Sequence, residues 1–461
     1  MVTPGAWGAG APCSQALAWV AGHRVGTFAL TGVRGAYRYA TRLARPAPAP
    51  RVAASLPTTE TIEHIVSLAR RIREMEASPT QAVDAKAKAL KAAGEPVIGF
   101  GAGEPDFPTP AHIVAAAQRA AELPASHRYT PAPGQPVLRE AIAELTSRTA
   151  GRTISAAEVV LANGGKHALY NVFMTLLDEG DEVIVPAPYW VSYPEQIKLA
   201  GGVPVVVSTT GDDGFQATVD QLEQARTERT KALVFVSPSN PTGAVYPPEA
   251  TAAIGNWAAE HGIWVITDEI YDRLVYGDTV FTSLPAVAPD AAPRTIITSG
   301  VAKTYAMTGW RVGWAIAPVD VASGMAKLQS QVTSNVCNVA QAAALEAITG
   351  DQGPSEAMRQ AFDRRRRVAV DALSAIPGVS VFEPTGAFYV FPSFESYLGG
   401  EVAGRHVAST LDLAEVLLDE AKVAVVPGEA FGAPGYARLS YALSDEDLVE
   451  GITRIGTLLQ S

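Results

Sequence analysis

The feature that most constrains the fold is an alternation of short runs rich in β-branched residues with longer segments of helical spacing, beginning near Val159. This alternation is typical of α/β proteins with a doubly wound sheet. Several runs are apolar at consecutive positions, as expected of parallel strands covered on both faces. We therefore predict a central, mostly parallel sheet with strands at residues 159–162, 182–185, 203–207, 232–236, 263–267 and 295–298.

A second, smaller α+β unit is predicted toward the C-terminus. There a helical pattern over residues 355–375 precedes strand-like runs at 423–426 and 436–441, and the segment 70–100 is expected to join them. With 461 residues, 48% of them hydrophobic, the chain can bury more than one core. We expect an N-terminal extension (1–59), an arm with part of the small domain (60–111), a large domain (112–345) and a small C-terminal domain (346–461).

Composition excludes several classes of function. The net charge of -11 argues against partners such as nucleic acid or anionic lipid, which attract clustered Lys and Arg. No apolar run approaches the roughly 20 residues that span a bilayer, so no membrane segment is expected. With only Cys13 and Cys337, neither a disulfide framework nor a multi-cysteine metal site is predicted, which favours a reducing compartment, the cytoplasm.

Residues 1–59 differ from the rest because they contain six Arg and no acidic residue. An organelle transit peptide, a dispensable extension and a misplaced start codon are all consistent with this composition. We expect this segment to be disordered.

Chemistry is expected after the strands, because ligands of open α/β sheets bind at the carboxyl ends of the strands. Gly164, Gly165 and Lys166 follow the first predicted strand and open a helix over 168–177. Bare backbone N–H groups at a helix start suit a phosphate. An ordinary strand-to-helix turn explains the same residues.

Two further strands end in polar residues. Asn240 lies between prolines on a turn, where it presents an amide to a ligand or simply shapes the turn. Asp268 ends an apolar strand, and a buried carboxylate there needs a cation or a hydrogen-bond donor. A protonated pyridine nitrogen is one such partner, with Tyr271 placed for a neighbouring atom of the same ring. The alternative for Asp268 is an N-cap of the next helix.

Lys303 stands in the most informative stretch, residues 298–313, which read TSGVAKTYAMTGWRVG. Small residues before Lys303 let a bulky ligand approach its amine, and Arg311 offers a planar fork for a phosphate. The stretch resembles the lysine signature of class I pyridoxal-phosphate aminotransferases. Many relatives carry a hydroxyl residue where this chain has Gly300.

Further matches in the same order extend the resemblance from about Ser78 to the C-terminus. They are GEPDF at 103–107, YTPAPG at 129–134, PYWVSY at 188–193 and RLSYA at 438–442. The resemblance implies the fold-type I architecture of these transferases, with a large sheet domain and a smaller α+β domain. It also implies pyridoxal 5′-phosphate as cofactor and amino acids and 2-oxo acids as substrates.

The resemblance also assigns roles to residues. Lys303 forms the Schiff base and then moves the substrate proton, and Asp268 keeps the pyridine nitrogen protonated. Asn240 and Tyr271 hydrogen-bond the ring hydroxylate, and Trp190 stacks on the ring. Arg311 and the backbone N–H groups around Gly165 and Lys166 hold the phosphate. Tyr129 reaches the phosphate of a neighbouring subunit, which implies a homodimer with shared sites. Gly103 and Arg438 bind the substrate carboxylate, and Trp190 and Asn240 also contact the substrate.

The pattern resembles most the bacterial aspartate aminotransferase branch, which includes enzymes that act on prephenate. In that branch Lys166 and Thr80 would hold the distal carboxylate, so transfer from aspartate to 2-oxoglutarate is the preferred reaction. The alternatives are a prephenate, alanine or aromatic amino acid aminotransferase, or a carbon–sulfur lyase on the same fold. Transcription regulators of this fold carry an added DNA-binding domain, for which residues 1–59 are unsuited.

One basic run does not belong to these motifs. Residues 364–367 are four consecutive arginines inside the predicted helix 355–375. We expect them to form a solvated helix face rather than a nucleic-acid patch.

Overall fold

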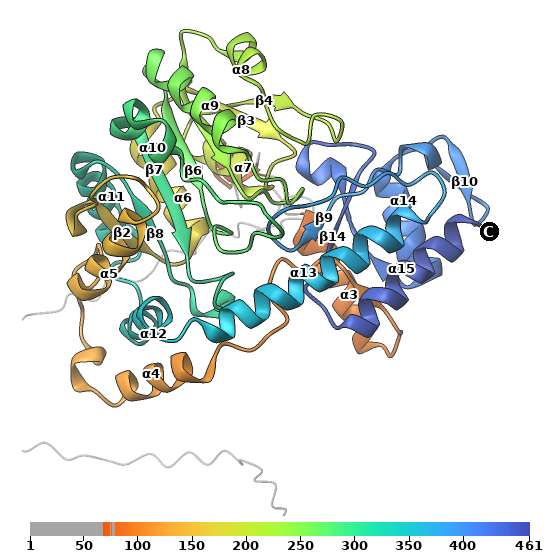
Figure 1. Cartoon of the computed structure of the whole chain (residues 1–461), viewed down its shortest axis with the longest axis horizontal. Coiled ribbons are helices and arrows are strands. Elements are labelled where there is room, and N and C mark those ends of the chain that lie inside the picture. Colours follow the sequence, from red (N-terminus) through yellow and green to blue (C-terminus); the bar gives the residue numbers. More distant parts are fainter. Residues whose placement is uncertain (1–67, 74, 76–78) are drawn as a thin grey trace, which may run out of the picture. The chain divides into compact units, whose positions relative to one another are not determined.

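The computed structural model describes residues 68–73, 75 and 79–461. The extension that we expect to be disordered, residues 1–59, lies outside the described residues. The remaining chain forms a large seven-stranded sheet and a group of smaller sheets, each with its own helices (Figure 1). The boundaries assigned to domains from the sequence remain a prediction.

The large sheet has the strand order β2-β8-β7-β6-β5-β3-β4. All neighbours pair in parallel except β8, which runs antiparallel to both β2 and β7. The six predicted strands are confirmed, whereas β8 was missed because its four residues follow the lysine motif with only a three-residue 3-10 helix, Thr308–Trp310, before them. The strands are β2 (Val159–Ala162), β3 (Glu182–Ala187), β4 (Val203–Ser208), β5 (Thr230–Val236), β6 (Trp264–Asp268), β7 (Thr295–Gly300) and β8 (Gly313–Ile316).

Helices cover both faces of this sheet. Because successive residues of a strand point to opposite faces, neighbouring residues pack against different helices. Val234 and Ile266 pack with α6 (Gly165–Leu176), α7 (Ser192–Leu199) and α11 (Val319–Val332). Leu233 and Val265 pack on the other face, toward α9 and α10. The helices of that face and its flank are α4 (Ala111–Ala121), α5 (Pro136–Ser147), α8 (Val219–Ala225), α9 (Pro248–Glu260), α10 (Leu284–Val287) and α12 (Asn338–Thr349).

The smaller sheets combine both ends of the described chain. Strand β1 (Ile98–Gly99) pairs in parallel with β12 (Val423–Ala424), and β9 (Tyr389–Val390), β14 (Ala437–Ser440) and β13 (Val426–Pro427) form an antiparallel sheet. The predicted α/β fold with a smaller α+β part is thereby confirmed. The remaining elements are α2 (Arg70–Arg73), α3 (Pro79–Ala92), α13 (Gly353–Ser374), α14 (Thr410–Val416), α15 (Asp445–Leu459) and the hairpin β10 (Gly400–Val402) with β11 (Arg405–Val407).

Helix α13 is 22 residues long and runs from the flank of the large sheet toward the small sheets (Figure 1). Its buried residues Phe362, Ala369 and Leu373 belong to the core of the small sheets. No helix in the described part of the chain is long and apolar enough to cross a membrane.

Candidate active site

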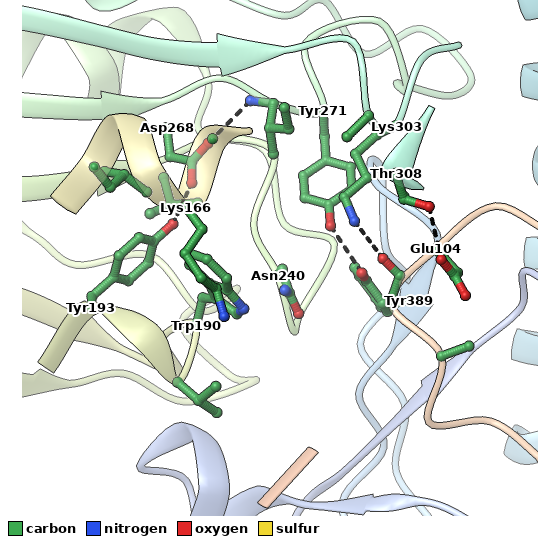
Figure 2. Close-up of a pocket in the computed structure, with 18 of the residues that line it drawn as sticks. Glu104, Lys166, Trp190, Tyr193, Asn240, Asp268, Tyr271, Lys303, Thr308 and Tyr389 are labelled. Carbon is green, nitrogen blue, oxygen red and sulfur yellow. Dashed lines mark hydrogen bonds between the residues drawn. The ribbon is translucent and has the colours of Figure 1, made fainter. Parts of the chain in front are cut away.

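A cavity of about 400 Å³ lies where β5, β6 and β7 end. Both parts of the described chain contribute to its wall, because residues from the small sheets face the loops of the large one (Figure 2). Ten of the twelve residues assigned from the sequence line it: Gly103, Gly165, Lys166, Trp190, Asn240, Asp268, Tyr271, Lys303, Arg311 and Arg438.

Lys303 enters the cavity from the loop that follows β7. Its Nζ donates a hydrogen bond to the Gly103 carbonyl and lies 5.9 Å from the centre of the Tyr271 ring. Burial, followed by the positive charge of Arg438, lowers the pKa of Lys303 from 10.5 to about 8. The amine is therefore neutral in a far larger fraction of molecules at neutral pH than a solvated lysine, as a nucleophile or base requires.

Gly300, the position where relatives carry a hydroxyl residue, has a steric explanation. A Cβ atom there would lie 2.9 Å from the Val312 carbonyl oxygen and 3.0 Å from the Gly313 Cα. The antiparallel pairing of β7 with β8 brings this backbone close. In this chain β8 thus occupies the space that a hydroxyl side chain would need.

Asp268 ends β6 and is buried. The Tyr193 hydroxyl donates to its Oδ2 over 2.7 Å, and the Ile270 backbone N–H donates to its Oδ1 over 3.2 Å. Desolvation raises the pKa of Asp268, although both hydrogen bonds lower it. The N-cap alternative is wrong, since residues 270–273 form a turn and no helix starts there.

Tyr193 is the last residue of the PYWVSY motif at 188–193, and the sequence predicted no role for it. It is buried, three residues after Trp190, and the two rings meet edge to face at 5.3 Å between centroids. Trp190 lies just before α7 and Tyr193 lies in its first turn, so their closeness in the sequence suggests that the two rings are neighbours. The hydrogen-bond partner of Tyr193, Asp268, could not be inferred from the sequence because the two residues are 75 positions apart.

Arg438, 2% exposed, comes from β14 and meets residues far away in the sequence. Its Nη1 donates to Asn240 Oδ1 over 2.9 Å and its Nη2 to the Gly101 carbonyl over 2.8 Å. Its Nε is buried without a partner. The guanidinium also lies 4.5 Å from the centre of the Tyr389 ring. Burial lowers the pKa of Arg438.

Tyr389 is a second cavity residue that the sequence did not reveal. Its hydroxyl lies 2.9 Å from the Tyr271 hydroxyl, in hydrogen-bond contact. Burial raises the pKa of Tyr389, and Tyr271, buried beside it, has its pKa raised as well. Tyr389 stands in the apolar run AFYVF at 387–391, where it looks like a core residue.

A cluster of donors forms the opposite end of the cavity. Gly164, with φ 85°, caps α6, whose first backbone N–H groups lack intrahelical acceptors. A Cβ atom at Gly164 would lie 2.5 Å from Arg311 Nη2, so the guanidinium packs directly over this turn. Lys166 Nζ lies 5.0 Å from the centre of the Trp190 ring. Partial burial, with Arg311 nearby, lowers the pKa of Lys166.

Two assigned residues are not among those lining the cavity. Tyr129 is 90% exposed. Thr80 lies in the first turn of α3, but its side chain is not among those described. Among the described residues, no group of His, Cys, Asp and Glu side chains is arranged to hold a metal ion.

Comparisons with known proteins agree with this geometry. Residues 95–455 match the family described as aminotransferase class I and II. The chain is 59% identical to an aspartate aminotransferase of Streptomyces avermitilis, over 84% of this chain and 95% of the relative. It is 45% identical to an aspartate/prephenate aminotransferase of Cereibacter sphaeroides, over 84% and 97% respectively.

A solved structure extends the likeness to three dimensions. The aspartate aminotransferase of Thermus thermophilus with maleate superposes with a TM-score of 0.80 at 42% identity, covering 86% of this chain and all of that one. Together with a buried, weakly basic lysine at the head of the cavity, these matches establish that the chain is an aminotransferase and belongs to the class I and II family.

Proposed function

We propose that the cavity holds pyridoxal 5′-phosphate and that the enzyme transfers the amino group of aspartate to 2-oxoglutarate. The donor set fits this cofactor. A weakly basic amine (Lys303), a buried carboxylate (Asp268) and a helix start beneath a guanidinium (Arg311) suit an aldehyde, a pyridine nitrogen and a phosphate in turn. The Gly164 turn, which leaves no room for a side chain, supports the phosphate assignment.

The bound cofactor would supply an electron sink for the carbanion formed at the substrate Cα. Lys303 would take the Cα proton, for which its lowered pKa suits it. Asp268 would face the pyridine nitrogen and keep it protonated, and the Tyr193 hydrogen bond keeps the carboxylate oriented. Tyr271 and Asn240 would contact the ring hydroxyl, and Trp190 would stack on the ring.

Substrate carboxylates would meet two cations. Arg438, fixed by Asn240 and Gly101, would grip the α-carboxylate with Gly103 beside it. Its unpartnered Nε shows that its hydrogen-bonding capacity is not yet filled. Lys166, with Thr80, would bind the distal carboxylate of aspartate or 2-oxoglutarate. The observation that carries this proposal is the cation Lys166 beside Trp190 on the cavity wall.

A homodimer with shared sites is part of the proposal. Tyr129, which the resemblance assigns to the site of a second subunit, is 90% exposed and is therefore available for such a contact. Light scattering coupled to size exclusion tests the dimer directly. The cytoplasm is the proposed location, which is supported by the scarcity of cysteine.

Steady-state assays on reconstituted enzyme test the substrate. Aspartate and 2-oxoglutarate should give equal amounts of oxaloacetate and glutamate, and prephenate, alanine and aromatic amino acids should react more slowly. Ammonia or pyruvate in place of glutamate would identify a lyase. Replacing Lys303 by Ala should abolish turnover and the near-ultraviolet and visible absorbance of the covalently held cofactor.

The Lys166→Met variant tests the distal carboxylate contact. Its kcat/KM for aspartate should fall roughly 10- to 100-fold, because an anionic group loses its charged partner. Alanine, which has no distal carboxylate, is the matched control and should be unaffected. An equal loss for both substrates would assign Lys166 to the cofactor and not to specificity.

A further inference from the structure

The arginine run 364–367 is not a uniformly solvated helix face, so the expectation from the sequence is wrong for two of its four residues. Arg364 and Arg367 are exposed, but the side chains of Arg365 and Arg366 are only 11% and 7% exposed. Arg366 is held by Asp363 and Glu383 within the small-sheet part. Arg365 instead meets a segment that reaches the cavity.

That segment, residues 100–109, passes along one wall of the cavity. Its residues Gly101, Gly103 and Glu104 line the cavity. Gly101 accepts a hydrogen bond from Arg438, and Gly103 accepts one from Lys303. Two backbone carbonyls of the 100–109 segment therefore hold two cavity cations in position.

Both ends of the segment are fastened. At the start, the Ser440 backbone N–H donates to the Phe100 carbonyl over 2.9 Å. At the end, Thr109 Oγ1 donates to the Ala306 carbonyl over 2.7 Å and accepts from Trp310 Nε1 over 3.0 Å. Between these ends, Glu104 accepts from Thr308 over 2.8 Å.

Arg365 fastens the middle of the segment to α13. Its Nη1 lies 2.9 Å from Asp106 Oδ1, and its guanidinium lies 5.2 Å from the centre of the Phe107 ring. The Phe107 ring meets Phe362, one turn earlier on α13, edge to face at 5.6 Å. The Nε of Arg365 also binds Asp445 Oδ1 at 2.6 Å, at the first residue of α15.

The two carboxylates that Arg365 binds differ in exposure and belong to different parts of the structure. Asp106 is 27% exposed and belongs to the segment, whereas Asp445 is 66% exposed and belongs to the small-sheet part. A partly desolvated, geometrically fixed pair contributes more than an exposed one. The planar fork of arginine serves both carboxylates and the ring at once, which a lysine could not do.

We propose that Arg365 is a positioning residue for substrate binding: by clamping Asp106 and Phe107 to α13 it holds Gly101, Gly103 and Glu104 in place at the cavity wall. This inference rests on the proposed function, because the substrate would lie against that wall. The residues assigned to the cofactor lie in α6, at the end of β6 and in the loops beside the large sheet, none lies in residues 100–109, and of them Lys303 hydrogen-bonds the segment.

The test compares Arg365→Gln with Arg364→Gln, its exposed neighbour in the same run. Arg365→Gln should raise KM for aspartate roughly tenfold, with kcat and the cofactor dissociation constant changed less than about twofold. Arg364→Gln should leave all three unchanged. Asp106→Asn should reproduce the effect, and the double variant should be no worse than either single one. Asp445→Asn should have a weaker effect.

Hydrogen–deuterium exchange gives a readout that does not depend on the substrate. Amides of residues 100–109 should exchange faster in Arg365→Gln and Asp106→Asn, but not in Arg364→Gln. If aspartate is not turned over by the unaltered enzyme, the proposed substrate fails while this measurement still judges the clamp. Unchanged exchange in that segment, or an unchanged KM with only a lower melting temperature, would overturn the proposal.

Discussion

Replacing Lys303 by Met should stabilise the cofactor-free protein at neutral pH. The side chain is buried so that its pKa falls from 10.5 to about 8, which corresponds to a cost of about 3 kcal/mol in the folded state. Methionine removes that cost and keeps an apolar stem beside Tyr271 and Phe388. Loss of the hydrogen bond to Gly103 offsets about 1 kcal/mol, leaving a gain of about 2 kcal/mol.

The pH dependence of this gain follows from the direction of the shift. The folded state binds fewer protons at Lys303 than the unfolded state does between pH 8 and pH 10.5. The cost is therefore fully present below about pH 8 and disappears as the pH rises through 10.5. The advantage of Lys303→Met should shrink over that interval and become zero or slightly negative at its upper end.

Urea denaturation of the cofactor-free proteins at pH 7 and pH 10.5 measures both quantities. Lys327→Met, at an exposed position of α11, is the matched control and should change stability by less than about 0.5 kcal/mol. A Lys303→Met protein that is no more stable than the unaltered chain at pH 7 would refute the reasoning. An advantage that is as large at pH 10.5 would show that packing, and not charge, causes it.

Three further changes have defined outcomes. Tyr193→Phe removes a hydrogen bond to a buried carboxylate, so fluorescence titration should show pyridoxal phosphate binding weakened about tenfold. Arg438→Lys should raise KM for aspartate about 100-fold, measured by steady-state kinetics, because the bidentate fork is lost. Burial raises the pKa of Glu269 from 4.5 to about 8, so stability is lost as the pH rises from 4.5 to about 8, and the full cost is present above that interval. Glu269→Gln should therefore be more stabilising in urea denaturation at pH 9 than at pH 5.

Local patterns predicted the large sheet well. Strand positions follow from runs of consecutive apolar residues. Asn240, Asp268 and Lys303 come at or after the ends of such runs, so these candidate site residues could be found before the fold was known. The exception, β8, lacks the preceding α-helix that marks a crossover. It pairs on one side with β7, which directly precedes it, but on the other side with β2, about 150 residues earlier in the sequence.

The sequence by itself determined the order of the motifs, the residue types in the cavity and the family. Only the tertiary structure decided which partners those groups have. Tyr193 hydrogen-bonds Asp268, Arg438 hydrogen-bonds Asn240, and Arg365 of the basic run forms an ion pair with Asp106. The physical reason is that spacing along the chain reports local backbone geometry. Desolvation and hydrogen-bond partners depend on residues that only folding brings together.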